Sequence, residues 1–380
     1  MKIVYCIPDC SYSGGTERTL SLQANYFAEN GHEVHIVTTE KPYKAYNSYV
    51  FSDKIKFHNL SINYKEVDNL TSLSGIISKI KKNQVHFKKL TTLLTAIKSD
   101  FTITLYGHEL SFLYKIKDGS KKIIEFHFSR YYKKIECSNN TSLLKKWFVF
   151  LKEWRKRYFI HNYDAFVVLT QEDAINWKKY KKTYVIPNAI PFVHIHTSNC
   201  QNKKIISVGR LTFQKGYDML IEAWNMIANK YPEWEINIYG SGEEYSKLIS
   251  KIEKYNLSNS LKIYPPVNDI KSKYIESAIY VMSSRYEGLP MVLIEAMSCG
   301  LPCISFACPC GPSEIIKNGD NGYIVPERNI RALADKMQIL IENEKKRKEM
   351  GRRAKQEIAC YSKEHVMSLW SNLFYSLLQK

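Results

Sequence analysis

The sequence predicts an α/β fold in which two doubly wound parallel sheets face each other across a cleft. Short apolar runs alternate with glycine loops and amphipathic segments, which is the pattern of βαβ units and implies parallel strands. The same alternation starts again near residue 204. A chain of 380 residues is also long enough for two domains of ordinary size, each with its own core.

The first domain opens with a strand, a glycine-containing loop, a helix and a second strand. We predict these elements at Lys2–Ile7, Pro8–Gly15, Thr16–Glu29 and Glu33–Thr38. Further strands are expected at Phe101–Leu105, Lys122–Phe126, Ala165–Leu169 and Thr183–Ile186. We end this domain, residues 1–188, at the start of a polar stretch with two prolines, Pro187–Gln201, which is typical of a linker.

The second domain, residues 189–362, repeats this order of elements. Its predicted strands are Lys204–Val208, Glu235–Tyr239, Leu261–Tyr264, Ala278–Met282 and Pro302–Ser305. The C-terminal part is rich in helix, with segments predicted at Ile330–Glu342, Glu344–Tyr361 and Lys363–Leu378. Both halves are therefore expected to be Rossmann-like, with helices between the strands of a parallel sheet.

Bulk composition narrows the class of protein. Hydrophobic residues make up 44% of the chain and the mean hydropathy is −0.33, as in soluble globular proteins. No stretch approaches the roughly 18 apolar residues of a membrane helix, and Met1–Ile7 is too short for a signal-peptide core. The net charge of +18 favours a polyanionic partner, namely nucleic acid, anionic lipid or a phosphorylated substrate, without choosing among them.

The nine cysteines are odd in number and scattered, which fits a reducing cytoplasm. Four of them cluster at Cys299, Cys303, Cys308 and Cys310. A zinc site there would lack both a CxxC pair and a nearby histidine, so we interpret these cysteines as small buried hydrophobic residues.

Two acids, Glu287 and Glu295, bracket the start of a predicted helix. Eight positions on a helix would place them about two turns apart on nearly one face. The Gly-Leu-Pro turn after Glu287 marks a helix start, where free backbone N–H groups and the helix dipole attract an anion such as a diphosphate. One site could therefore hold a phosphate on the backbone and sugar hydroxyls on the two carboxylates.

This pattern resembles the acid-x7-acid motif of retaining glycosyltransferases of family GT4, which have the two-domain GT-B fold. Ser207–Leu211 followed by Lys215-Gly216 is similar to the basic loop of that family. Ser283–Tyr286 before the first acid, Ala296–Pro302 after the second, and Asn321–Tyr323 stand in the family order. The match is strong from about Ile205 to Val325 and weaker before it. The resemblance also implies that the last helix, residues 363–380, crosses back to the first domain.

The resemblance implies a role for each charged side chain of the site. Arg210 and Lys215, directly after a predicted strand, would neutralise the diphosphate and stabilise it as a leaving group. Glu295 would accept hydrogen bonds from the ribose hydroxyls. Glu287 and His127, the latter at the end of a first-domain strand, would contact the donor sugar. Of these five residues, we predict Arg210, Lys215, Glu287 and His127 to be catalytic.

Backbone groups and glycine turns complete the predicted donor site. The amides of Gly288, Leu289, Met291 and Val292 can meet the diphosphate or sugar, whereas Pro290 has no N–H to donate. The Gly14-Gly15 pair stands where a loop must let the substrate approach the backbone. Gly240 begins a turn that resembles a dinucleotide fingerprint without its third glycine, and we expect it to pass near the nucleotide.

We predict transfer of a hexose or N-acetylhexosamine from a UDP-sugar to a glycan acceptor, with retention at the anomeric carbon. No cofactor and no metal are expected, because cations and helix amides replace the metal and no Asp-x-Asp motif lies near the site. The family and the positive charge indicate surface-polysaccharide assembly on a polyprenyl-diphosphate-linked acceptor. We expect a cytoplasmic protein held peripherally at the anionic inner face of the membrane, with no nucleic acid partner.

Two points stay open at this stage. The basic and aromatic segment Leu143–Ile160 could lie on an anionic bilayer or pack its apolar stripe on its own sheet. The function could also be that of a UDP-sugar epimerase of related fold, which needs no acceptor. A nucleic-acid-binding protein is the alternative that the charge alone suggests, although no binding motif supports it.

Overall fold

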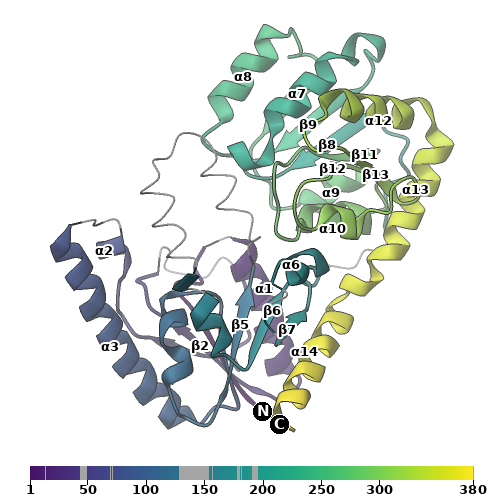
Figure 1. Ribbon diagram of the computed structural model, residues 1–380. Coiled ribbons are helices and arrows are strands. Elements are labelled where there is room, and N and C mark those ends of the chain that lie inside the picture. Colours follow the sequence, from purple (N-terminus) through teal and green to yellow (C-terminus); the bar gives the residue numbers. More distant parts are fainter. Residues whose placement is uncertain are drawn as a thin grey trace.

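The computed structural model describes the chain except residues 13, 43–48, 69, 71, 128–153, 156, 178–179, 181, 191–195 and 380. It contains two sheets, one above the other in Figure 1, with helices around each of them. Every strand pair in both sheets is parallel. The predicted fold class of two doubly wound α/β units is therefore confirmed.

The first sheet has the strand order β3-β2-β1-β4-β5-β6-β7. Its strands are β1 (Lys2–Ile7), β2 (Glu33–Thr38), β3 (Lys56–Asn59), β4 (Phe101–Thr104), β5 (Lys121–Phe126), β6 (Ala165–Val168) and β7 (Thr183–Val185). Its helices are α1 (Gly15–Glu29), α2 (Lys65–Asp68), α3 (Leu73–Ile97), α6 (Gln171–Asn176) and the 3-10 turns η1 (His108–Ser111) and η2 (Leu113–Lys115). The central strands are buried along nearly their whole length, as expected for a parallel sheet covered on both faces.

The second sheet has the strand order β10-β9-β8-β11-β12-β13. Its strands are β8 (Lys204–Val208), β9 (Glu235–Tyr239), β10 (Leu261–Tyr264), β11 (Ile279–Met282), β12 (Cys303–Phe306) and β13 (Gly322–Val325). The α-helices are α7 (Tyr217–Asn225), α8 (Tyr245–Lys254), α9 (Ile270–Ile275), α10 (Met291–Ser298), α11 (Pro312–Ile315), α12 (Ile330–Glu342) and α13 (Glu344–Glu357). The 3-10 turns are η3 (Phe213–Lys215), η4 (Ala228–Lys230) and η5 (Ile358–Tyr361).

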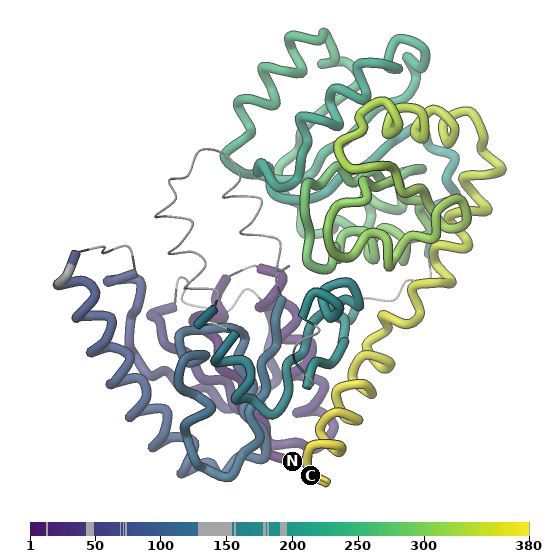
Figure 2. Tube along the Cα trace, viewed as in Figure 1, coloured from purple at the N-terminus to yellow at the C-terminus, as the bar shows by residue number. Residues whose placement is uncertain are grey.

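The last helix, α14 (Lys363–Leu378), packs against the first sheet rather than the second. Its Trp370 and Phe374 belong to the same buried cluster as Ile3 and Phe101. The rings of Phe101 and Phe374 stack with centroids 4.4 Å apart. The chain therefore ends beside its own N-terminus, as the tube view shows (Figure 2).

Parallel strands present their carboxyl ends at one edge of the sheet, and this edge carries the loops that can bind a ligand. In the first sheet, β1 leads through the glycine loop into α1, and β5 ends just before His127. In the second sheet, β8 ends two residues before Arg210, and β11 ends five residues before Glu287. The fold thus brings the predicted site residues to the facing edges of the two sheets.

Several elements of the first domain were not predicted from the sequence, among them β3 and α3. The edge strand β3 is largely exposed and lacks a clear apolar alternation. Helix α3 mixes lysines with apolar residues. Its buried face includes Leu90 and Leu94, but isoleucines that stay exposed obscure the helical period of that face in the sequence. Both errors concern segments in which solvent-facing side chains conceal the period of the buried ones.

Candidate active site

A cavity of about 570 Å³ lies between the two sheets and takes residues from both. A pocket of this size is in the range that buries a small-molecule ligand. Nine predicted site residues line it: Gly15, His127, Arg210, Lys215, Glu287, Gly288, Leu289, Met291 and Val292. Of the other three, Gly14 and Glu295 neighbour residues that line it, and Gly240 stands behind one of its loops.

The side chains of Lys215 and Glu287, which both line this cavity, form an ion pair. The Lys215 Nζ is 2.7 Å from the Glu287 Oε1, and the Ser284 hydroxyl donates to the same oxygen at 2.6 Å. The side chain of Glu287 is 7% exposed and that of Lys215 is 15% exposed. A carboxylate this deeply buried requires such partners, because burial of a lone charge is costly.

The loop that carries Lys215 is tied to the loop that carries Glu287. The Arg285 guanidinium donates to both carboxylate oxygens of Asp218, at 2.9 and 2.6 Å, and lies over the ring of Phe213. Gly216 adopts φ +64°, and a side chain there would meet the Ser283 carbonyl oxygen at 2.2 Å. A glycine is therefore needed at the point where the two loops touch.

Arg210 differs from Lys215 because its side chain is exposed and has no ion pair or side-chain hydrogen bond among the residues that the structure describes. Its loop rests on the turn that starts at Gly240. A Cβ atom at Gly240 would lie 1.9 Å from the Gly209 carbonyl oxygen, so a side chain there would displace the basic loop. Gly240 thus supports Arg210 from behind and does not line the cavity itself.

Glu295 lies in the second turn of α10, whereas Glu287 lies in the loop before it. Because α10 begins at Met291, our expectation that the two acids share one helix face is wrong. The turn through Pro290 sets the position of Glu287 instead, and the Glu287 N–H donates to the Pro309 carbonyl at 3.2 Å. Both acids are nevertheless buried.

The first turn of α10 faces the cavity. Met291 and Val292 line it together with Gly288 and Leu289, and the N–H groups of a first helical turn have no partner within the helix. Gly311 packs behind this turn, because a Cβ there would lie 2.4 Å from the Pro290 ring. These backbone donors and the positive end of the dipole make this a place for an anionic group.

The first-domain side of the cavity is less tightly bonded. Gly15 starts α1, and a Cβ atom at this position would meet nothing within 4 Å, so the space beside it is open. At Gly14 a Cβ atom would instead meet the Glu17 carboxylate at 2.2 Å. The ring nitrogens of His127 are buried and have no hydrogen-bond partner among the described residues, although Nε2 is 3.3 Å from the Glu125 Oε1.

Some residues of the site were not anticipated. Arg18 lines the cavity and its guanidinium contacts the Glu295 carboxylate of the other domain. Tyr49 and Asn188 also line it, and Ser284 bonds Glu287. Only Ser284 had a sequence signal, since it lies in the Ser283–Tyr286 segment of the motif. The other three come from distant parts of the chain that only the fold brings together.

The described part of the chain contains no group of three or more His, Cys, Asp or Glu side chains arranged to hold a metal ion. The clustered cysteines Cys299, Cys303, Cys308 and Cys310 are free and buried. Burial raises the pKa of the Cys299 thiol to about 11. No helix among the described residues is long and apolar enough to cross a membrane.

Residues 193–357 match the family model described as glycosyl transferases group 1. They form a group 1 glycosyltransferase domain. A Haemophilus influenzae protein named as an uncharacterized glycosyltransferase is 27% identical over 98% of this chain and 99% of its own length. The amylovoran biosynthesis glycosyltransferase AmsD of Erwinia amylovora is 38% identical over 54% of this chain and 61% of its own. The predicted resemblance to glycosyltransferases is confirmed.

Solved structures of glycosyltransferases share the fold of the whole chain. Staphylococcus aureus TarM, solved in a complex that contains UDP, superposes with a TM-score of 0.78 at 17% identity, covering 98% of this chain and 99% of its own. Sucrose-phosphate synthase of Thermosynechococcus elongatus reaches 0.81 at 16% identity, covering 100% and 99%. The chain therefore has the GT-B fold, with its cavity where the two domains meet.

Proposed function

We propose that this glycosyltransferase moves a hexose or N-acetylhexosamine from a UDP-sugar to a glycan acceptor, with retention at the anomeric carbon, as GT4 enzymes do. One observation carries the proposal. A single cavity brings together a cation, Arg210, that has no side-chain partner among the described residues, a buried ion pair, Lys215–Glu287, and the first turn of α10. A diphosphate has the charge and the oxygen acceptors that match these groups.

In this mechanism the diphosphate lies against Arg210, Lys215 and the amides of the first turn of α10. Glu287 lies beneath the donor sugar and His127 faces it from the first domain. The bond between the anomeric carbon and the diphosphate oxygen breaks while the acceptor oxygen bonds to the same face of that carbon. The acceptor hydroxyl gives its proton to the departing phosphate oxygen. Positive charge placed where the phosphate charge develops lowers the barrier, so we propose that no metal ion is needed.

Solved relatives and curated relatives support the choice of donor. TarM was solved with UDP, and the pneumococcal enzyme GtfA with UDP and GlcNAc. One curated relative is named as a poly(ribitol-phosphate) alpha-N-acetylglucosaminyltransferase, 30% identical over 58% of this chain. AmsD is named for the biosynthesis of a polysaccharide. These names favour a UDP-sugar and an α-linked product in polysaccharide assembly.

The proposal is tested by donor binding and turnover. Thermal shift with a panel of UDP-, GDP- and ADP-sugars should show stabilisation by one UDP-sugar, about 2.7 kcal/mol at 100 times its dissociation constant. Glu295→Ala should lose this stabilisation, because it removes the carboxylate that we propose accepts hydrogen bonds from the ribose hydroxyls. The matched control is Glu349→Ala, which removes an exposed acid on α13.

Three outcomes would contradict the proposal. No stabilisation by any nucleotide, with salt-sensitive binding to random DNA, would favour the nucleic-acid alternative. Conversion of the UDP-sugar to its epimer without an acceptor would favour an epimerase. Inversion at the anomeric carbon, followed by NMR of the product, would leave the enzyme class intact and exclude the retaining mechanism.

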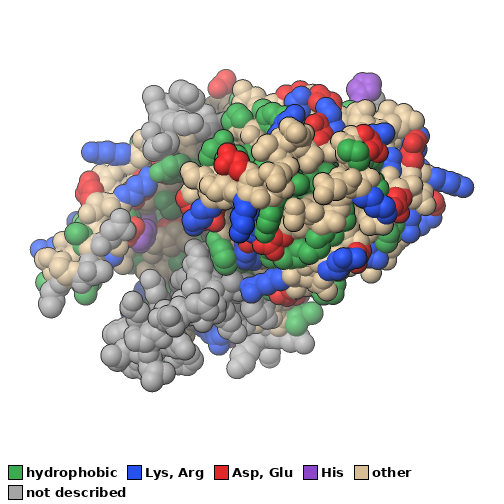
Figure 3. Space-filling view, turned by 90° about the horizontal axis from the view of Figure 1, so that it is seen from above, with side chains coloured by type: hydrophobic (Ala, Val, Ile, Leu, Met, Phe, Trp, Pro, Cys, Tyr) green, Lys and Arg blue, Asp and Glu red, His purple; other side chains and the backbone are tan. Residues whose placement is uncertain are grey.

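We further propose that the acceptor is lipid-linked and that the protein meets an anionic membrane through α3. Residues 1–188 hold 30 Lys and Arg against 17 Asp and Glu, so they carry +13 of the net +18. On the face of the molecule seen in Figure 3, by contrast, basic and acidic side chains are interspersed. Positive charge concentrated in one domain favours one orientation at an anionic surface.

Helix α3 presents an apolar stripe to solvent. The side chains of Ile76, Ile77 and Ile80 are 52%, 49% and 53% exposed, and lysines flank them along the helix. Transfer of such exposed isoleucine side chains from water into an apolar phase lowers the free energy, and the flanking lysines can contact anionic headgroups. The predicted membrane segment Leu143–Ile160 lies largely outside the described residues, so α3 carries this proposal.

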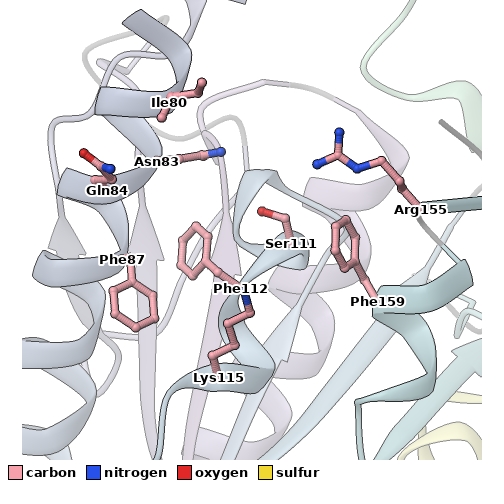
Figure 4. Close-up of a pocket in the computed structure, with 9 residues that line it drawn as sticks. All are labelled: Ile80, Asn83, Gln84, Phe87, Ser111, Phe112, Lys115, Arg155 and Phe159. Carbon is pink, nitrogen blue, oxygen red and sulfur yellow. The ribbon is translucent and has the colours of Figure 1, made fainter. Parts of the chain in front are cut away.

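A groove beside the stripe suits an apolar chain that bears a phosphate. It has a volume of about 530 Å³ and is lined by the rings of Phe87, Phe112 and Phe159 (Figure 4). Two cations, Lys115 and Arg155, lie at its margin. Aromatic walls with basic groups at the edge match a phosphorylated lipid better than a free sugar.

Vesicle co-sedimentation tests this surface. The unmodified protein should bind phosphatidylglycerol vesicles more tightly than phosphatidylcholine vesicles. The double variant Ile76→Asn/Ile80→Asn should reduce that binding about tenfold or more, since an isoleucine that becomes buried in the membrane contributes roughly 1.5–3 kcal/mol. The control Ile175→Asn replaces an isoleucine that is 55% exposed on α6. Equal binding of the α3 variant would exclude α3 as the membrane surface.

A further inference from the structure

An arginine of the first domain touches the acid that we assign to the donor ribose. Arg18 lies in the first turns of α1, and its Nη2 donates to the Oε1 of Glu295 on α10. The two residues are 277 positions apart in the chain. Among the described residues, no other ion pair joins the first domain, residues 1–188, to the second.

The pair is well sheltered from water. The side chain of Glu295 is 4% exposed and that of Arg18 is 29% exposed. Burial on its own lowers the pKa of Arg18, but the Glu295 carboxylate outweighs this and the pKa is raised. The second carboxylate oxygen of Glu295 accepts from the Tyr274 hydroxyl at 3.4 Å. Arg18 and Tyr274 thus hold the two oxygens of one carboxylate from opposite domains.

A held carboxylate still has room for a ligand. An ionised carboxylate has about four acceptor positions, of which Arg18 and Tyr274 use two. Arg18 also lines the cavity, together with Gly15 on its own helix and Met291 at the start of α10. Its guanidinium has further N–H donors beyond the one that Glu295 accepts. Arg18 therefore lies at the wall of the space in which the donor would bind, and Glu295 is in direct contact with it.

We propose that Arg18 is a positioning residue for the nucleotide, acting through Glu295, which rests on the proposed function of Glu295 as the ribose acceptor. Arg18 fixes the carboxylate so that its free lone pairs point at the ribose hydroxyls. Because Arg18 belongs to the other domain, the carboxylate is fully oriented only when the two domains meet. Nucleotide binding is thereby coupled to apposition of the domains.

The same contact between Arg18 and Glu295 would also be present if Arg18 blocked the nucleotide site, but removing Arg18 would then have the opposite effect on affinity. If Arg18 occupied the place of the ribose hydroxyls, it would have to leave before the nucleotide entered, and its removal would tighten binding. A purely structural link between the domains would change thermal stability and leave the affinity for a nucleotide as it was. The sign of the change in affinity separates these cases.

Calorimetric titration with UDP tests the proposal in wild type, Arg18→Ala, Glu295→Ala and the double variant. We expect Arg18→Ala to weaken UDP binding about tenfold or more, which is about 1.4 kcal/mol. In the Glu295→Ala background the same substitution should change affinity less than about threefold, because residues that act as a unit are not additive. Arg18→Lys keeps the charge but not the planar fork, and should restore binding only in part.

A second ligand makes the test specific to the ribose. With 2′,3′-dideoxy-UDP, which lacks both ribose hydroxyls, wild type and Arg18→Ala should bind with nearly equal affinity. The control Arg331→Ala removes an arginine–carboxylate pair on α12, outside the cavity, and should leave both affinities unchanged.

Unchanged or tighter UDP binding by Arg18→Ala, or an equal loss with the dideoxy ligand, would overturn the proposal. If wild type itself bound no UDP, the proposed function would fail, and the role of Arg18 with it. If Arg18→Ala failed to fold, Arg18→Lys and the two ligands would still give the comparison.

Discussion

The two sides of the cavity are built differently. On the second-domain side, Lys215 and Glu287 are already paired, and the loops that carry them are bonded to each other. On the first-domain side, Gly15 borders open space and the ring nitrogens of His127 lack hydrogen-bond partners among the described residues. The difference suggests a donor site assembled in advance, facing a side that its ligand completes. Preorganised charge is the more effective arrangement for a developing leaving group.

The largest effect on stability is expected when the ion pair between Lys215 and Glu287 is broken. Lys215→Met leaves the buried Glu287 carboxylate with the Ser284 hydroxyl as its one remaining side-chain partner among the described residues. It should lower the free energy of unfolding by about 3 kcal/mol. Urea denaturation measures this loss. The double variant Lys215→Met/Glu287→Leu should recover most of the stability without recovering activity. A single variant as stable as wild type would show that the pair contributes little to the assembly of the site.

Arg210 offers the contrasting case on the same side. Because its side chain is exposed and has no described partner, Arg210→Ala should change the free energy of unfolding by less than about 0.5 kcal/mol. The rate of transfer should nevertheless fall about 10²- to 10³-fold, the usual consequence of removing one donor to a developing anion. Steady-state kinetics beside a denaturation curve separates the two effects. A loss of stability as large as the loss of rate would mean that Arg210 is structural.

The sequence could predict much of the second-domain side because motif and element coincide there. Strands such as β8 and β9 were predicted with the bounds that the structure has, since buried parallel strands are continuous apolar runs. The order of the basic loop, Glu287 and Glu295 placed the site. The pairing of Arg18 with Glu295 could not be predicted, because no local rule connects residues 277 positions apart.

The sequence did not predict helix α3 or the position of Glu287, because neither follows from a regular pattern of buried residues. Helix α3 presents isoleucines to solvent, so its pattern is not that of an ordinary surface helix. The position of Glu287 depends on the turn at Pro290 and not on helical spacing. Sequence patterns report burial and local turns, whereas exposed apolar faces and contacts across a cleft depend on the assembled domains.

His127 tests the first-domain side, with a smaller effect than Arg210. Its ring nitrogens await partners in the cavity, so His127→Ala should cost about 1–3 kcal/mol of transition-state stabilisation, roughly tenfold to hundredfold in kcat. The dissociation constant of UDP alone should stay within about twofold, because we propose that the histidine faces the sugar. His127→Asn retains a donor and an acceptor and should keep part of the rate. An unchanged kcat, or a weakened UDP affinity, would place His127 outside the sugar subsite.

The smallest effect concerns a buried acid that, unlike Glu287, has no ion pair among the described residues. Glu109 on η1 accepts from the Thr104 hydroxyl at 2.5 Å, and burial raises its pKa above the ordinary value. A raised pKa in the folded state means that its stabilising contribution is complete below the ordinary pKa of about 4.3 and is lost as the pH rises through the folded value. Glu109→Gln should therefore match wild type near pH 4 and be more stable at pH 7, by about 1 kcal/mol. Melting curves across this range measure the difference. If Glu109→Gln were the less stable protein at pH 7, the Glu109 carboxylate would have a partner that compensates its charge.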